Sequence, residues 1–135
     1  MRLLIDTSAW VDYLRGAGTP AANAVRHHLL APATEVFICE PIAMELLAGA
    51  GDHARVRKLE TLVNGLPSLS IDPWADFRDA AQIYRTARVA GETIRSLIDC
   101  LIAAVALNHA VTVLHKDRDF DAIAQVTGLR SITGT

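Results

Sequence analysis

The chain has 135 residues, of which 51% are hydrophobic and 21% are charged, and its formal net charge is −2. This length suits one domain that buries about two thirds of the surface of its unfolded chain, so we expect residues 1–135 to form a single domain. The charge balance excludes a broad basic surface for nucleic acid but allows a local basic rim.

The cysteines and the hydrophobic segments of the sequence indicate in which compartment of the cell the protein is expected. Cys39 and Cys100 lie far apart in apolar stretches, which predicts buried free thiols in a reducing environment rather than a disulfide. Asp6 follows only a few apolar residues, so we expect no secretory signal. The longest apolar run, 100–107, is too short to cross a bilayer. We therefore expect a soluble, cytoplasmic protein that does not contact a membrane.

The first half of the chain predicts two strands and four helices from its apolar periodicity and capping residues. In chain order these are a strand at Arg2–Ile5, helices at Ala9–Arg15 and Pro20–Leu30, a strand at Glu35–Cys39, and helices at Ile42–Gly49 and Arg55–Val63.

The second half predicts a short strand, three helices and two further strands. These are a strand at Leu69–Ile71, a helix from Asp72 to Ala90, a helix around Ser96–Leu107, a strand at Val111–Leu114, a helix at Phe120–Val126 and a strand at Leu129–Ile132. The inner face of the Asp72–Ala90 helix is expected at Trp74, Phe77, Ala81 and Tyr84. Strands that alternate with helices indicate an α/β fold with a mostly parallel sheet covered on both faces.

The segment 96–107 is nearly continuous apolar sequence that contains one carboxylate, Asp99. Apolar residues at helical spacing, namely Ile94, Leu97, Ile98, Leu101, Ile102 and Val105, predict a helix buried along a broad stripe. An ionised Asp removed from water costs several kcal/mol unless something compensates it. Two explanations stay open: an ion pair with Arg95, four residues earlier, or a metal cluster that includes other acids.

Other acids are expected near the same edge of the sheet. Asp6 directly follows the first strand, and Asp117 follows the strand that ends at Leu114. Functional crevices of open α/β sheets lie at the carboxyl ends of the strands. If these strands are neighbours, Asp6, Asp99 and Asp117 meet there. Clustered carboxylates repel one another, and a divalent cation removes that penalty. Ligands that are all oxygens suit Mg²⁺ or Mn²⁺, and such sites typically process phosphates.

Each acid also has a purely structural explanation. Asp6 suits the amino-terminal cap of the next helix, and Asp117 and Asp119 suit the cap and first turn of a later one. Glu45 suits a solvent-exposed surface acid, and Glu40 competes with it as the acid at the strand end.

Four blocks of the sequence resemble a PIN-domain ribonuclease, and more closely a VapC-type toxin of a type II toxin–antitoxin system. They are Leu4–Trp10 (LIDTSAW), Ile42–Leu46 (IAMEL), Ile98–Ala103 (IDCLIA) and Leu114–Phe120 (LHKDRDF). The blocks come in the family's order and span essentially the whole chain. The resemblance implies a PIN-like three-layer sandwich.

The resemblance also implies a set of site residues. The catalytic acids would be Asp6, Glu45, Asp99 and Asp117, which would hold Mg²⁺ or Mn²⁺, with Asp119 as a further ligand or an outer neighbour. It favours Glu45 over Glu40, a choice that spacing leaves open.

Hydroxyl residues beside the first acid would position a water or the acid itself. Thr7 or Ser8 would orient a metal-bound water or the Asp6 carboxylate. The chain departs from the family at His115, where many members have a small hydroxyl or amide residue. No water-positioning role is therefore carried over to that position.

Proteins of this family are endoribonucleases that cut structured RNA, often tRNA or ribosomal RNA. A cognate antitoxin inhibits them, and its tail often places an Arg or Lys against the acids. They commonly form dimers. We therefore expect an RNA substrate, a VapB-type antitoxin and a homodimer. Four basic residues are candidates for binding RNA phosphates, with an ordinary solvent-exposed face as the alternative: Arg15, Arg95, Lys116 and Arg118.

Two other functions compete with this interpretation. A non-catalytic PIN-like module that binds RNA or a partner would be favoured by the loss of one metal acid, but all the acids are present. A phosphoacceptor receiver domain needs an Asp at a strand end near mid-chain, whereas Asp52 follows no predicted strand.

Overall fold

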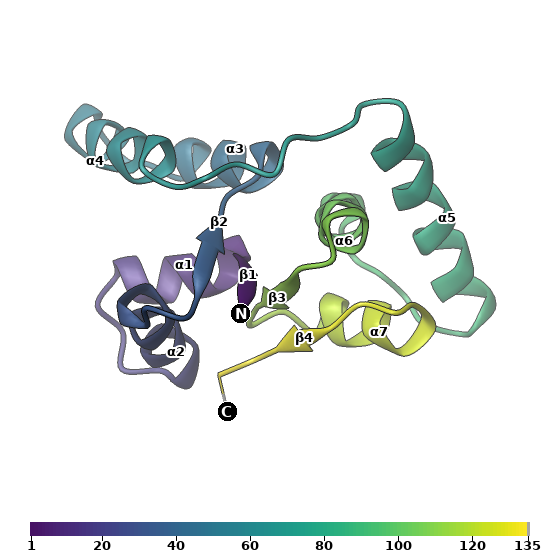
Figure 1. The fold of residues 1–135 in the computed structure, drawn as a ribbon. Coiled ribbons are helices and arrows are strands. Elements are labelled where there is room, and N and C mark those ends of the chain that lie inside the picture. Colours follow the sequence, from purple (N-terminus) through teal and green to yellow (C-terminus); the bar gives the residue numbers. More distant parts are fainter. Residues whose placement is uncertain (135) are drawn as a thin grey trace.

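The computed structural model describes residues 1–134, which form four strands and seven helices (Figure 1). In chain order the elements are β1 (Arg2–Ile5), α1 (Thr7–Leu14), α2 (Pro20–Leu30), β2 (Glu35–Phe37), α3 (Glu40–Ala48), α4 (His53–Asn64), α5 (Ala75–Val89), α6 (Leu97–His109), β3 (Thr112–Leu114), α7 (Arg118–Val126) and β4 (Ser131–Ile132).

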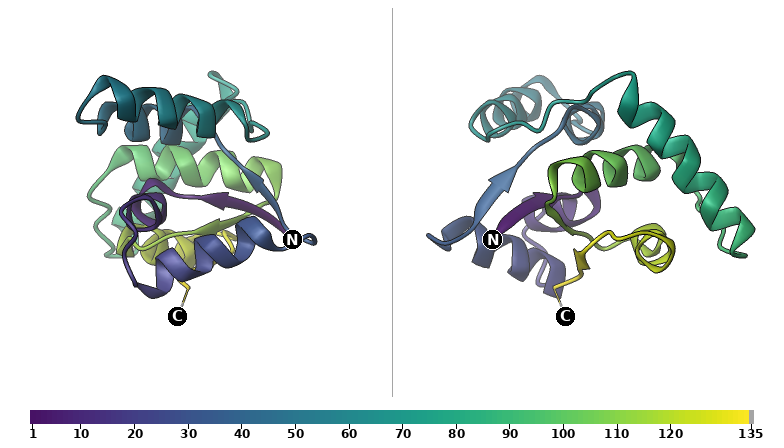
Figure 2. Two further views of the ribbon diagram at one scale, coloured as in Figure 1. Left: turned by 90° about the vertical axis from the view of Figure 1, so that its left-hand side faces the viewer. Right: turned by 45° about the vertical axis from the view of Figure 1, so that its right-hand side comes forward.

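The four strands form one parallel sheet in the order β2-β1-β3-β4. Helices α1 and α2 cover one face of this sheet, and α5, α6 and α7 lie on the other (Figures 1 and 2). The apolar side chains of β1 and β3 are buried on both faces of the sheet. This burial explains why both strands are continuous apolar runs rather than alternating ones. The predicted α/β class, with a parallel sheet between two layers of helices, is confirmed.

Helix α6 is the most deeply buried helix, and every residue from Asp99 to Ala106 is buried. Small side chains at Ala103, Ala104 and Ala106 let neighbouring elements approach closely, and α5 packs along its length. The predicted stripe is wrong at Leu97, which is 62% exposed, whereas Ile94 before it is buried. The first turn of α6 lies at the edge of the sheet, where one side remains open to solvent.

The inner face of α5 differs from the predicted one. The buried residues are Asp76, Ala80, Ile83 and Ala87, whereas Trp74 and Phe77 are exposed. The reason is that Asp76 is held inside by hydrogen bonds: its carboxylate accepts from Asn108 Nδ2 at 2.6 Å and from the Asp72 N–H at 2.8 Å. These bonds turn the opposite side of α5 toward water. The exposed Trp74 ring stacks under the Arg78 guanidinium, 3.8 Å from the ring centroid.

Three further predictions have clear outcomes. Segment 69–71 is not a strand; only a single parallel bridge joins Ser68 to Ile38. Cys39 and Cys100 are buried free thiols, as predicted. Within residues 1–134, no helix is long and apolar enough to cross a membrane.

Candidate active site

The candidate site lies at the carboxyl ends of β1 and β3, where two acid-bearing turns meet. Strands β1 and β3 are direct neighbours, with Ile5 opposite Leu114. The Asp6 N–H donates to the Leu114 carbonyl at 2.9 Å. The condition set for the acids to meet is therefore fulfilled: β1 and β3 are neighbours, which places Asp6 beside the turn that carries Asp117.

Three carboxylates form the tightest cluster at this edge. Asp99 lies in the first turn of α6, Asp117 caps α7, and Asp119 lies in the first turn of α7. One oxygen from each carboxylate lies within 4.8 Å of the others. Asp99 and Asp119 are buried and Asp117 is half-buried, so the cluster is largely shielded from water.

Asp6 is buried beside this cluster and is fixed by its neighbour Ser8. Asp6 Oδ2 accepts from the Ser8 N–H at 3.0 Å and from the Ser8 hydroxyl at 2.6 Å, while the Ser8 Oγ accepts from the Lys116 N–H at 2.9 Å. Ser8 therefore orients the Asp6 carboxylate and joins the two turns. The capping explanation for Asp6 also holds, because the same bond caps α1.

Glu45 reaches the site from α3. The Thr7 hydroxyl donates to Glu45 Oε1 at 2.8 Å. Glu40 instead accepts from the Ile71 N–H at 3.1 and 3.2 Å. The structure therefore directs Glu45, and not Glu40, toward Asp6.

Asp119 holds the loop that precedes α6. Its carboxylate accepts from the N–H groups of Arg95 and Ser96 at 3.2 Å, and the Arg95 Nε lies 3.9 Å away. Arg95 precedes the start of α6, so the helical ion pair considered for Asp99 is wrong. Asp99 therefore still needs another compensating charge.

Burial and mutual repulsion make the acids hard to ionise together. Burial, with help from neighbouring carboxylates, raises the pKa of Asp99 to about 9. Burial also raises the pKa of Asp6 and of Glu45. Among the described residues, Asp6 Oδ1 and Asp99 Oδ2 are buried and have no hydrogen-bond partner. A divalent cation would satisfy both oxygens and remove the repulsion, so this donor set fits Mg²⁺ or Mn²⁺.

The metal-free protein is expected to lose stability as the pH rises from about 4 to about 9. The pKa of Asp99 increases from 3.8 in the unfolded chain to about 9 in the folded protein. The native state therefore binds more protons than the unfolded chain across this range, so the free energy of unfolding falls as the pH rises. The stability that the protonated Asp99 contributes is lost once the pH passes the pKa of the folded protein. Thermal unfolding in EDTA should show a falling Tm, and added Mg²⁺ or Mn²⁺ should restore it. A Tm that does not change with pH or with either metal would contradict this account of the cluster.

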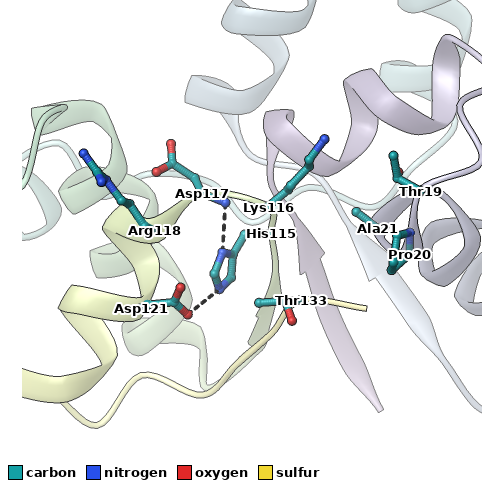
Figure 3. A pocket seen from close by; sticks show the side chains of 9 residues that line it. All are labelled: Thr19, Pro20, Ala21, His115, Lys116, Asp117, Arg118, Asp121 and Thr133. Carbon is teal, nitrogen blue, oxygen red and sulfur yellow. Dashed lines mark hydrogen bonds and ion pairs between the residues drawn. The ribbon is translucent and has the colours of Figure 1, made fainter. Parts of the chain in front are cut away.

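His115 is fully buried on the other side of the Asp117 turn (Figure 3). Its Nδ1 accepts from the Asp117 N–H at 3.2 Å, so in the neutral ring the proton is on Nε2, which lies 3.7 Å from Asp121 Oδ1. Burial lowers the pKa of His115. The ring therefore supports the backbone of the turn, and the Asp117 carboxylate points away from it (Figure 3).

The four predicted basic residues lie in two places. Arg95, Lys116 and Arg118 border a hollow of about 550 Å³ that also contains Asp117 and Asp119. The Lys116 Nζ is paired with Asp12 at 2.8 Å. Arg15 instead lines a separate cleft that reaches Glu45.

Sequence reasoning missed two basic residues of this second cleft, Arg55 and Lys58 on α4. Their spacing of three residues puts them on one face of the helix. The same spacing is common on ordinary solvent-exposed helices, so the sequence contained no specific signal for a site.

Comparison with known proteins identifies the family. The family model for the PIN domain matches residues 3–126. The chain belongs to the PIN-domain family.

Relatives of this chain show which group of the PIN-domain family it resembles. Ribonuclease VapC11 of Mycobacterium tuberculosis and VapC ribonuclease Mb1587 of Mycobacterium bovis are each 56% identical to it over 129 residues, which cover 96% of both chains. Ribonuclease VapC18 of M. tuberculosis is 32% identical over 95% of this chain and 91% of its own. This similarity places the chain among the VapC ribonucleases.

Solved structures show the same fold. VapBC-1 from nontypeable Haemophilus influenzae matches with a TM-score of 0.76 at 19% sequence identity, over 99% of this chain and 98% of that one. VapC20 of M. tuberculosis, described as a toxin that cleaves the sarcin–ricin loop, matches with a TM-score of 0.64 at 21% identity, over 95% and 98% of the two chains.

Proposed function

We propose that this single-domain protein is a metal-dependent endoribonuclease toxin that hydrolyses phosphodiester bonds of structured RNA in the cytoplasm. The observation that carries the proposal is the acidic centre. Within residues 1–134, two of its buried carboxylate oxygens have no hydrogen-bond partner, and burial raises the pKa of Asp99 to about 9. A chain gains nothing in stability from such a cluster unless a cation compensates it. The full-length similarity to VapC ribonucleases supports the same reaction.

The acids would hold Mg²⁺ or Mn²⁺ and act as the catalytic centre. Asp6, Glu45, Asp99 and Asp117 are the proposed ligands, and Asp119 either joins them or holds the α6 loop from outside. When bound, the ion supplies a hydroxide at neutral pH by lowering the pKa of water and stabilises charge on the phosphate.

The other proposed roles follow from contacts in the chain. Thr7 holds the Glu45 carboxylate through its hydroxyl, and Ser8 holds Asp6. These bonds use one oxygen of each carboxylate, and the other Asp6 oxygen, Oδ1, is buried with no hydrogen-bond partner among the described residues. Arg95, Lys116 and Arg118 border the acids and would bind phosphates of the RNA next to the scissile one.

The proposed partners are an inhibitory VapB-type antitoxin and a second copy of this chain. Several solved structures of the same fold are toxin–antitoxin complexes, including VapBC2 of Rickettsia felis bound to promoter DNA. An Arg or Lys from the antitoxin tail would neutralise the acidic centre in the same way as a cation, which gives inhibition a direct electrostatic basis.

Cleavage of total cellular RNA tests this function. We expect discrete fragments with Mg²⁺ or Mn²⁺, and none after EDTA removes the metal. Sequencing the fragment ends would then identify the RNA and the cut site. A folded, antitoxin-free protein that binds RNA but cuts none with either metal would instead support a non-catalytic binding module.

A further inference from the structure

A cleft of about 540 Å³ opens between α1, α3 and α4, next to the acidic centre. Its basic residues are Arg15, which directly follows α1, and Arg55 and Lys58 on α4. Its walls are apolar and include Val11, Leu14, Leu46 and Leu59. The size is within the range of pockets that hold small organic groups.

The three cations of this cleft form no close ion pair within the part of the chain that the structure describes. Among residues 1–134, none of the ion pairs includes Arg15, Arg55 or Lys58. All three side chains are exposed, so they remain hydrated and available to an anion. Among the described residues, Glu45 is the one carboxylate that lines the cleft, and the Thr7 hydroxyl already donates to one of its oxygens. The cleft therefore attracts anions along the wall opposite Glu45.

The position of Glu45 connects the cleft to the acidic centre. Glu45 is bonded to Thr7, and Thr7 is adjacent to Asp6. On the other side of the acids, Arg95 and Arg118 border the second hollow. The acids thus lie between two hollows that both carry unpaired or exposed cations. An extended polyanion that crosses the acids would meet positive charge on either side.

We propose that the cleft binds the RNA strand next to the scissile phosphate, with Arg55 and Lys58 contacting backbone phosphates beside Arg15. The apolar walls cover the sugar and base of a nucleotide, while the cations at the mouth of the cleft hold its phosphates. This inference rests on the proposed function and adds a defined path for the substrate. It also assigns to α4 a role in binding RNA.

The test compares two double variants that each remove two positive charges. Arg55→Ala/Lys58→Ala changes the cleft, whereas Arg57→Ala/Arg85→Ala removes exposed cations that do not line it. Anisotropy of a fluorescein-labelled oligouridylate of about 12 nucleotides measures binding over a range of salt concentrations. Far-UV circular dichroism confirms that both variants fold.

We expect the cleft variant to bind about 10-fold more weakly than the control at about 0.1 M salt. Its plot of log K against log salt should also be flatter by about 1.4, because each lost phosphate contact contributes about 0.7 on a single strand. Equal affinity and equal slope in the two variants would overturn the proposal. So would normal RNA binding combined with lost inhibition by the antitoxin, since the cleft would then belong to the antitoxin.

Failure of this inference is distinguishable from failure of the proposed function. If the native protein cleaves RNA but the two variants bind alike, the cleft has no role and the nuclease assignment stands. If binding depends on Arg55 and Lys58 but no metal supports cleavage, the cleft proposal stands and the nuclease assignment falls.

Discussion

Asp99→Asn is expected to abolish RNA cleavage while leaving the fold intact. The substitution keeps the shape of a buried side chain but removes a proposed metal ligand at the centre of the cluster. Loss of one electrostatic group at a reacting centre costs at least about 100-fold in rate. The rate of fragment formation from total RNA, measured at saturating Mg²⁺ or Mn²⁺, would show this loss.

The same variant should be more stable than the native protein without metal. Burial raises the pKa of Asp99 to about 9, so at neutral pH this carboxyl must take up a proton when the chain folds, which costs stability, whereas Asn needs none. We expect a gain of about 2 kcal/mol in the free energy of unfolding in EDTA, well below the full pKa difference because the neighbouring acids and water relax. Higher stability together with lost cleavage separates a missing ligand from a damaged fold.

Asp52→Asn is the matched control for this prediction. Asp52 caps α4 outside the acidic centre, and Asn caps helices as well as Asp does. We expect native cleavage and native stability from it. A well-folded Asp99→Asn protein that cleaves at the native rate would exclude Asp99 as a metal ligand.

Trp10→Ala should destabilise the protein by about 3–5 kcal/mol, enough to unfold many domains of this size. Trp10 is fully buried on α1 and packs edge-on against Tyr13, with 6.0 Å between ring centroids. Removing the ring leaves a large cavity in the core, because a packed core closes only partly around it. Urea unfolding followed by circular dichroism measures the loss.

The chain contains its own control for this effect, because it has two tryptophans. Trp74 is 70% exposed, and its main contact is the Arg78 guanidinium. Trp74→Ala should therefore cost less than about 1 kcal/mol. Equal costs at the two positions would mean that α1 is not packed as described.

The strands and the acids at their ends could be predicted from the sequence, because both depend on the pattern of neighbouring residues along the chain. The apolar runs of β1 and β3 are both followed by acids within three residues. Parallel pairing then brings Asp6 and Asp117 to one edge without any detailed packing information. Choosing Glu45 over Glu40 needed the family resemblance, because both acids follow the same strand closely.

The features that sequence missed all depend on contacts between distant elements. The inner face of α5 is set by Asn108 on α6, which donates a hydrogen bond to Asp76. This bond allows a polar residue to be buried at a position where its hydropathy predicts exposure. The partner of Arg95 is Asp119, 24 residues away, and not the nearer Asp99. Arg55 and Lys58 become candidates for binding RNA only because α4 lines the same cleft as Glu45. Periodicity along one helix contains no information about such neighbours.

The Ser8 hydroxyl joins two turns that are 108 residues apart in sequence. It donates its single proton to Asp6 and accepts the Lys116 N–H, so the direction of the hydrogen-bond chain is fixed. The two turns are therefore expected to move together. A ligand that displaces the Lys116 backbone also displaces the Asp6 carboxylate, because Ser8 Oγ is hydrogen-bonded to both. A ligand bound on one side of the site can therefore shift the acid on the other side through the Ser8 oxygen, in addition to the bond between the Asp6 N–H and the Leu114 carbonyl.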